Sequence, residues 1–172
     1  MTENGEPRPV SRSRSELIRW MSIQDANSAG FVHGGVVMRM CDEVAGIASI
    51  RHSGCRVVTA GMDRMTFTEP VHVGELLRCV ASVNAVWRTS MEVGVRVEAE
   101  NAVTGEVRST GTAYLTMVAV DERGSPVQVP PLLVETPTEE RRQREAEARR
   151  RNRLAEREEI LEARRAAEAA AS

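Results

Sequence analysis

The sequence has no lysine, because all 23 basic side chains among its 172 residues are arginines. Lysine supplies the amine of Schiff bases and pyridoxal-phosphate anchors, and it is the charged residue of the phosphate-binding P-loop. Sites of these kinds are therefore excluded. Any phosphate group that the chain binds must be held by arginine, by backbone N–H groups or by a metal ion.

The sequence also has few aromatic side chains and a net charge close to zero. Phe, Trp and Tyr together make up 3% of the residues, and the formal net charge is −2. Aromatic stacking and a basic surface are the usual means of holding nucleic acid. Since the chain has little of either, we expect no nucleic-acid partner.

Cysteine pairs and long apolar runs are absent as well. Cys41, Cys55 and Cys79 are odd in number and form no C-x-x-C, which argues against a disulfide framework or a zinc ribbon. The histidines lack a ligand spacing too, so we expect no metal and no cofactor.

No run approaches the roughly 18 apolar residues of a membrane span, and the first residues lack the apolar core of a secretory signal. We therefore expect a cytoplasmic protein without a membrane span.

Three zones follow one another along the chain. Residues 1–14 are polar and contain two prolines, which predicts a disordered lead. Residues 15–135 carry nearly all of the large apolar side chains and form the one domain that this length supports. Residues 136–172 are rich in arginine, glutamate and alanine, with 10 arginines against 9 glutamates.

The last zone is predicted to be a charged helix. Thr136 and Glu139 have the spacing of a capping box, with Pro137 at the first helical position. Pairs such as Glu145 and Arg149 stand four residues apart with glutamate first, which stabilises an exposed helix. Two leucines seven residues apart raise the alternative of a coiled coil, but charged residues occupy the seam between them. A solvated helix of roughly 45 Å is the default prediction.

The middle zone is predicted to contain one long helix followed by strands. Apolar residues recur at helical spacing from Gly34 to His52, and Gly54 can end the helix. Alternation with period 2 follows in three runs, at residues 77–87, 91–99 and 112–119.

With a short strand over about 15–23, these elements predict an α+β fold. Its architecture would be four further antiparallel strands wrapped round one long central helix, with the charged C-terminal helix added. A domain of about 120 residues buries only around two-thirds of its surface, so we expect a second copy to complete the core.

The segment D-A-N-S-A-G-F-V-H-G-G at residues 25–35 could carry chemistry. Gly34 and Gly35 open the helix, where unpaired backbone N–H groups can stabilise a developing oxyanion. Asp42 lies on the side of the helix away from the apolar arc. The alternatives are ordinary structural roles: a solvated Asp42, a turn residue at Asn27 and a structural histidine at His33.

Several motifs resemble the hotdog-fold acyl-CoA thioesterases. They are D-A-N-x-x-G-x-x-H-G-G, M-R-M-C-D-E-V-A-G at residues 38–46, F-x-x-P-x-x-x-G at 67–74, T-S-M-E-V at 89–93 and V-P-P at 129–131. The resemblance covers about residues 15–135. It is closest to the acyl-CoA hydrolase branch that includes the two-domain cytosolic (brain-type) enzyme and short bacterial homologues.

The resemblance implies hydrolysis of fatty acyl-CoA to the free acid and CoA. It assigns catalysis to Asn27 and Asp42, contributed by opposing hotdog units, and a related branch also uses the residues that correspond to His33 and Gly34. Together with the Gly34 and Gly35 N–H groups at the helix start, these residues would support the oxyanion. A chain with one unit would then form a homodimer with two shared sites, or a hexamer built as a trimer of dimers. Asp42 would act as a general base or as a nucleophile, and both remain open.

Arginine must recognise the CoA phosphates, because lysine is absent. Arg88, Thr89 and Ser90, between two predicted strands, are the leading candidates, and Arg64 is another. The alternative for Arg88 is a solvated residue at a strand end. A non-catalytic acyl-CoA binding or sensor protein on the same scaffold is the rival function.

Overall fold

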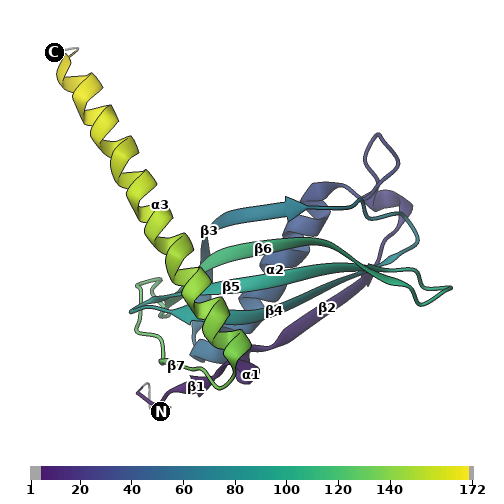
Figure 1. Ribbon diagram of the computed structural model, residues 1–172, viewed down its shortest axis with the longest axis horizontal. Coiled ribbons are helices and arrows are strands. Elements are labelled where there is room, and N and C mark those ends of the chain that lie inside the picture. The colour runs from purple at the N-terminus through teal and green to yellow at the C-terminus, as the bar shows by residue number, and fades with distance from the viewer. Residues whose placement is uncertain (1–4, 171–172) are drawn as a thin grey trace.

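The computed structural model describes residues 5–170, and Figure 1 shows a five-stranded sheet with a helix on each face. The elements in chain order are β1 (Arg8–Pro9), α1 (Val10–Ser13), β2 (Ser15–Trp20), the 3-10 turn η1 (Ile23–Asp25), α2 (Gly34–Ser53), β3 (Arg56–Phe67), β4 (Leu76–Val86), β5 (Ser90–Glu100), β6 (Val107–Val120), β7 (Leu132–Leu133) and α3 (Pro137–Ala170). The sheet has the order β2-β4-β5-β6-β3, and every neighbouring pair is antiparallel. The predicted α+β hotdog architecture is confirmed.

The central helix α2 has the predicted bounds to within one residue. His33 caps its first turn, and Gly54 ends it with a φ of +71°, a left-handed conformation that favours glycine. Its apolar side packs on one face of the sheet, called here the inner face. Its buried apolar side chains are Val37, Met40, Cys41, Val44, Ala45 and Ala48.

The inner face of the sheet confirms the predicted period-2 runs. Alternate residues of β4, β5 and β6 are almost fully buried beneath α2, among them Leu77, Val83, Val93 and Leu115. Each such side chain contributes about 1.5–3 kcal/mol when it leaves water. Cys79 and Cys41 touch in this core, and the hydrogen bond between them together with burial raises the pKa of the Cys79 thiol. These thiols therefore act as small core residues.

The helix α3 begins as predicted. The backbone N–H of Glu139 donates to Thr136 Oγ1 (3.3 Å), and Glu139 Oε2 accepts from the backbone N–H of Thr136 (3.0 Å). This is the reciprocal pattern of a capping box.

The prediction of a solvated helix is wrong for the first half of α3. This half crosses the outer face of the sheet, and only the second half projects beyond the sheet into solvent (Figure 1). Ala146 is fully buried, and Arg149 and Arg153 pair with acidic side chains of β5 and β3. The reason lies in the outer face of the sheet, which presents Glu92 and Tyr114 and, just after β4, Trp87. Long arginine stems can cover such side chains.

The prediction of a disordered lead is wrong for residues 8–14, while residues 1–4 lie outside the described residues. Val10 and Ser13 are buried, and the backbone N–H of Arg8 donates to Pro131 O (2.9 Å). Strand β4 extends past Ser15, the first residue of β2, and Ser13 Oγ accepts the Val83 N–H that β2 leaves unpaired (3.0 Å). A long-range partner thus orders a segment that has little apolar content of its own.

No helix among residues 5–170 is both long enough and apolar enough to cross a membrane.

Candidate functional site

The loop that leads into α2 is fixed by Asp25, the first residue of the D-A-N motif. Its carboxylate accepts from Ser22 N (2.8 Å) and Ser22 Oγ (2.9 Å) and pairs with the Arg19 guanidinium. The Ser22 N–H first, and Arg19 next, lower the pKa of Asp25 below its ordinary value. Its carbonyl oxygen accepts from His33 N (2.8 Å), which connects the loop to the helix start. Asp25 therefore has a structural role.

Asn27 presents a hydrogen-bond donor to a cavity. Its side-chain Oδ1 accepts from the backbone N–H groups of Ala29 (2.9 Å) and Phe31 (3.2 Å), in a turn where Gly30 has a φ of +83°. Because the oxygen is engaged twice, the orientation of the amide is determined. The amino group makes no hydrogen bond within residues 5–170 and remains free to donate to a ligand.

The cavity beside Asn27 has a volume of about 350 Å³. Gly34 lies in its wall opposite the ring of Phe67, and a Cβ added at Gly34 would lie 3.5 Å from that ring. The remaining wall is mainly apolar and is lined by Phe31, Val32, Val37, Thr68, Glu69, Pro70 and Val71. An apolar cavity with a few convergent donors is the usual form of a small-molecule site.

Only one of the two predicted glycine donors is available. His33 caps the helix through Nδ1, which accepts the Gly35 N–H (2.9 Å). The Gly34 N–H has no partner inside the helix, since it belongs to the first turn. The expectation that Gly35 also faces a ligand is therefore corrected, and the role found for His33 is that of a helix cap.

Asp42 is oriented by a threonine that the sequence analysis missed. Thr59 on β3 donates from Oγ1 to Asp42 Oδ1 over 2.5 Å. A hydroxyl that donates to a carboxylate forms a strong, directional bond. Asp42 Oδ2 makes no hydrogen bond within the described residues, and the side chain is exposed. No motif marks Thr59 in the sequence, because its partner stands 17 positions earlier on another element.

A single chain does not bring Asn27 and Asp42 together. Asn27 lines the cavity at the start of α2, and Asp42 is not among its lining residues. Asp42 follows Gly34 by eight positions, which corresponds to about 12 Å along the helix axis. Each chain therefore carries two separate halves of a candidate catalytic pair.

The proposed CoA-binding arginines lie at different places. Arg88 and Thr89 lie in the turn between β4 and β5, and Ser90 is the first residue of β5. The carbonyl oxygens of Arg88, Thr89 and Ser90 accept from Val129, Ala119 and Trp87, respectively. The Arg88 side chain is exposed and unpaired within the described residues. Arg64 pairs with Tyr114 in the sheet, whereas Ser90 pairs with Val118. Four residues along a ladder correspond to about 13 Å, so one chain does not gather both arginines round one ligand.

An antiparallel sheet wrapped round one long helix is the hotdog class of fold. A family model for the thioesterase superfamily matches residues 29–106. The cytosolic acyl coenzyme A thioester hydrolase of Rattus norvegicus is 36% identical over 148 residues, which is 85% of this chain and 39% of that protein. The chain thus spans about two-fifths of the length of the mammalian cytosolic hydrolases that it matches.

Two solved structures resemble nearly the whole chain. An apo-hexameric acyl-CoA thioesterase is 40% identical with a TM-score of 0.84, and the match covers 88% of this chain and 97% of that one. The acyl-CoA hydrolase of Staphylococcus aureus, solved with butyryl coenzyme A, coenzyme A and coenzyme A disulfide, is 32% identical with a TM-score of 0.83 and coverage of 90% and 94%. The chain belongs to the thioesterase superfamily, in its hotdog acyl-CoA thioesterase branch.

The S. aureus hydrolase has also been solved as three alanine variants. The changed residues are an asparagine, an aspartate and a threonine, which stand 15 and 17 positions apart. Asn27, Asp42 and Thr59 have the same residue types and the same spacing in this chain.

Proposed function

We propose that this protein hydrolyses fatty acyl-CoA thioesters in a site built from two copies of the chain. The observation that carries the proposal is that the two candidate catalytic side chains lie in different places within one chain. Asn27 offers a free amide donor in an apolar cavity, and Asp42 offers an oriented carboxylate about 12 Å further along α2. The names of the relatives and the coenzyme A complex of the S. aureus hydrolase support the choice of substrate class.

In the proposed reaction, the amino group of Asn27 and the N–H of Gly34 donate to the thioester carbonyl oxygen. Asp42, held through Oδ1 by Thr59, takes a proton on Oδ2 from a water molecule that attacks the carbonyl carbon. The tetrahedral intermediate collapses, the carbon–sulfur bond breaks and the proton passes to the CoA thiolate. The alternative for Asp42 is direct attack on the carbonyl carbon, which breaks the carbon–sulfur bond, releases the CoA thiolate and leaves an anhydride. Water then hydrolyses the anhydride to the free acid and the Asp42 carboxylate, and the proton released passes to the thiolate.

The second copy would join at the free edge of the sheet. Strand β3 is an edge strand of 12 residues, and its far side pairs with nothing in the described chain. Val58 and Phe67 on this strand are half exposed. Long unpaired edges with apolar side chains favour association with another strand. A homodimer is the smallest unit that would complete the site, and the hexameric relative supports a trimer of dimers.

The proposed ligands are acyl-CoA and CoA, with Arg88, Thr89, Ser90 and Arg64 as candidate contacts for the CoA phosphates. Since Arg88 and Arg64 lie apart in one chain, they would contribute to one CoA only from different copies. The cytosolic relatives support a cytoplasmic location.

The test is thiol release from acyl-CoAs of increasing chain length. Loss of the carboxylate in Asp42→Ala is expected to lower kcat about 10²–10⁴-fold, as for a general base. Asp42→Asn is the matched control, because it keeps the size and the hydrogen bond to Thr59 but cannot take the proton. Wild-type turnover in Asp42→Asn would rule out both roles proposed for this carboxylate.

Mixing two inactive variants tests the shared site. Co-expressed Asn27→Ala and Asp42→Ala chains give heterodimers in which one of two sites is intact, so about a quarter of wild-type activity is expected for random pairing. Each variant alone should stay inactive. If no activity returns in heterodimers shown to be folded, the two residues do not share a site across chains.

A further inference from the structure

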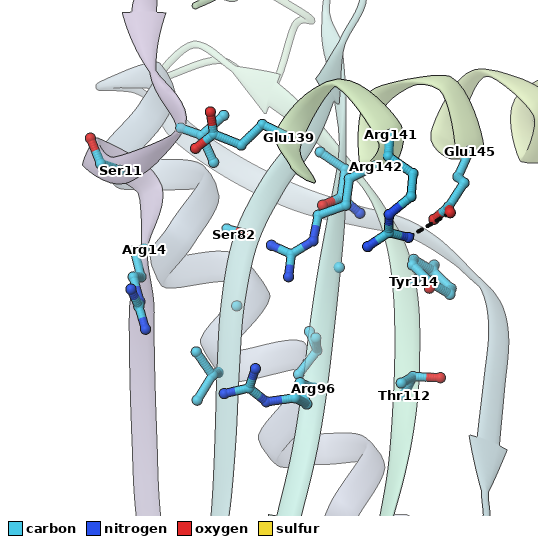
Figure 2. A pocket seen from close by; sticks show the side chains of 16 residues that line it. Ser11, Arg14, Ser82, Arg96, Thr112, Tyr114, Glu139, Arg141, Arg142 and Glu145 are labelled. Atoms are coloured by element: carbon cyan, nitrogen blue, oxygen red, sulfur yellow. Dashed lines mark hydrogen bonds and ion pairs between the residues drawn. The ribbon is translucent and has the colours of Figure 1, made fainter. Parts of the chain in front are cut away.

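A second cavity lies on the outer face of the sheet, under the first turns of α3 (Figure 2). Its volume is about 410 Å³, within the range of small-molecule pockets. The floor consists of outward-facing positions of β4, β5 and β6, including Ser82, Arg96 and Thr112. The inward-facing neighbours of these positions pack against α2, so the sheet separates this cavity from the core.

Four guanidinium groups line this outer cavity, and two of them take part in no ion pair among the described residues. Arg142 comes from α3 and Arg14 from the end of α1, and neither makes an ion pair or a side-chain hydrogen bond within residues 5–170. Arg96 pairs with Glu98 (2.7 Å), and Arg141 pairs with Glu145 (2.6 Å). Figure 2 shows the guanidinium of Arg142 directed away from α3 over the floor of the cavity.

The acidic groups near this cavity are engaged with other partners. Glu16, whose pKa Arg78 lowers first and Arg14 and Arg96 lower further, forms its ion pair with Arg78. The Glu139 carboxylate accepts the backbone N–H groups of Glu135 and Thr136 just before α3, and Glu145 pairs with Arg141. Hydroxyl groups of Ser11, Ser82 and Thr112 line the same space without a side-chain hydrogen bond in the described chain. Unpaired guanidiniums together with free hydroxyl donors are the groups that bind phosphate oxygens.

We infer that the outer cavity between α3 and the sheet binds a small phosphate-bearing anion, at a site separate from the one proposed for the thioester. Arg14 and Arg142 are like charges at the same cavity, and an anion bound between them would offset their mutual repulsion. Arginine is the expected binder in a chain without lysine, since its planar fork donates two hydrogen bonds to one phosphate. The ligand could be a free phosphate or diphosphate, or the phosphate part of a nucleotide.

The test is calorimetric titration of the full-length protein with pyrophosphate and with ADP at low ionic strength. Wild type is expected to bind, and Arg142→Ala is expected to weaken binding about tenfold or more through loss of a bidentate contact. Arg14→Ala should also weaken binding, and it tests the same cavity from another element. Arg151→Ala is the matched control, because Arg151 is exposed on the same helix and does not line the cavity.

Arg88→Ala separates this site from the proposed CoA contacts. Binding that survives in Arg88→Ala and weakens in Arg142→Ala supports the outer cavity. Equal affinities for pyrophosphate and ADP identify the phosphates as the whole ligand, whereas tighter ADP binding adds a contact to the nucleoside. Absence of binding to folded wild type at millimolar ligand, or equal binding by Arg142→Ala and Arg151→Ala, overturns the inference.

Discussion

The two faces of the sheet are each covered by a helix, but by different physical means. On the inner face, α2 packs apolar side chains such as Val44 against buried residues such as Leu115. On the outer face, α3 is held by arginines, with Arg149 bidentate to Glu92 (2.6 and 3.1 Å) and stacked 3.7 Å over the ring of Tyr114. Both faces belong to the same strands. The inward-facing residues of these strands therefore select an apolar helix, and the outward-facing residues select a charged one.

The apolar contacts of the inner face and the ion pairs of the outer face have different effects: the first mainly stabilise the fold, and the second mainly fix the position of a helix. Apolar contact is roughly proportional to area and tolerates small shifts of a helix. A buried ion pair gives little net stability, because desolvation offsets the attraction, but it is costly when only one partner is present. Arg150 adds a second contact by stacking 4.2 Å over Trp87. The ionic side therefore sets where α3 lies, and with it the shape of the outer cavity.

The largest effect is expected for Glu92→Ala. The Glu92 side chain is fully buried and Arg149 is 13% exposed, so the change leaves a largely buried cation without its partner. We expect a loss of about 3–5 kcal/mol in the free energy of unfolding. Urea denaturation measures it, and the double variant Glu92→Ala/Arg149→Ala should recover part of the loss. A cost below about 1 kcal/mol would contradict a tightly held outer face.

A slightly smaller loss is expected for Leu115→Ala on the inner face. Its side chain is fully buried beneath α2, and its removal should cost about 2–5 kcal/mol through lost burial and the cavity left behind. The same denaturation experiment at low and high salt gives the contrast with the outer face. A salt dependence in Leu115→Ala as large as that of an exposed ion pair would show that the inner face is not held by apolar contact.

A pH effect distinguishes the faces further, because the inner helix carries a buried neutral histidine. His52 is fully buried, its Nε2 lies 3.0 Å from Pro130 O, and its Nδ1 has no partner in the described chain. Burial, and then the charges of Arg8 and Arg12, lower its pKa despite the Pro130 contact. The unfolded chain therefore binds the proton first as the pH falls.

Stability should accordingly be full above the ordinary histidine pKa of about 6.5 and decrease as the pH falls below it, by at most about 1.4 kcal/mol per pH unit. Thermal unfolding between pH 5 and pH 7 measures this slope. His52→Gln should flatten it, because the amide cannot titrate in that range. A slope that is the same in His52→Gln would assign the effect to other groups.

The smallest effect is expected in the second half of α3, which touches neither face. Leu161 is 37% exposed and belongs to the half of α3 that projects beyond the sheet, so Leu161→Ala should change the free energy of unfolding by about 0.5 kcal/mol or less. Urea denaturation at two protein concentrations measures it. A larger loss that depends on concentration would show that another copy covers this half of the helix.

Local patterns in the sequence predicted the helix α2, three of the long strands and the start of α3. Gly54 ends α2 and Thr136 caps α3, as their positions in the sequence indicate. These predictions succeed because side-chain periodicity and capping act over a few neighbouring residues. The segment that contains the candidate site was found in the same way, from its motifs.

Contacts between distant residues were not predictable in this way. The lead was predicted to be disordered because the sequence does not show that Val83 leaves an N–H for Ser13, 70 positions earlier. The helix α3 was predicted to be solvated, because its arginines can pair with nearby glutamates as well as with Glu92. The bond between Thr59 and Asp42 was missed for the same reason.

The sequence by itself thus determined the class of fold, the segment that bears the candidate site and the absence of lysine chemistry. Only the tertiary structure decided three further points. The backbone N–H of Gly35 donates to the His33 ring, the side-chain amino group of Asn27 is left free to donate, and Asn27 and Asp42 stay apart within one chain. Periodicity and capping depend on neighbours in the sequence. The partner of a polar group buried across a sheet is chosen by three-dimensional proximity, which the folded chain alone provides.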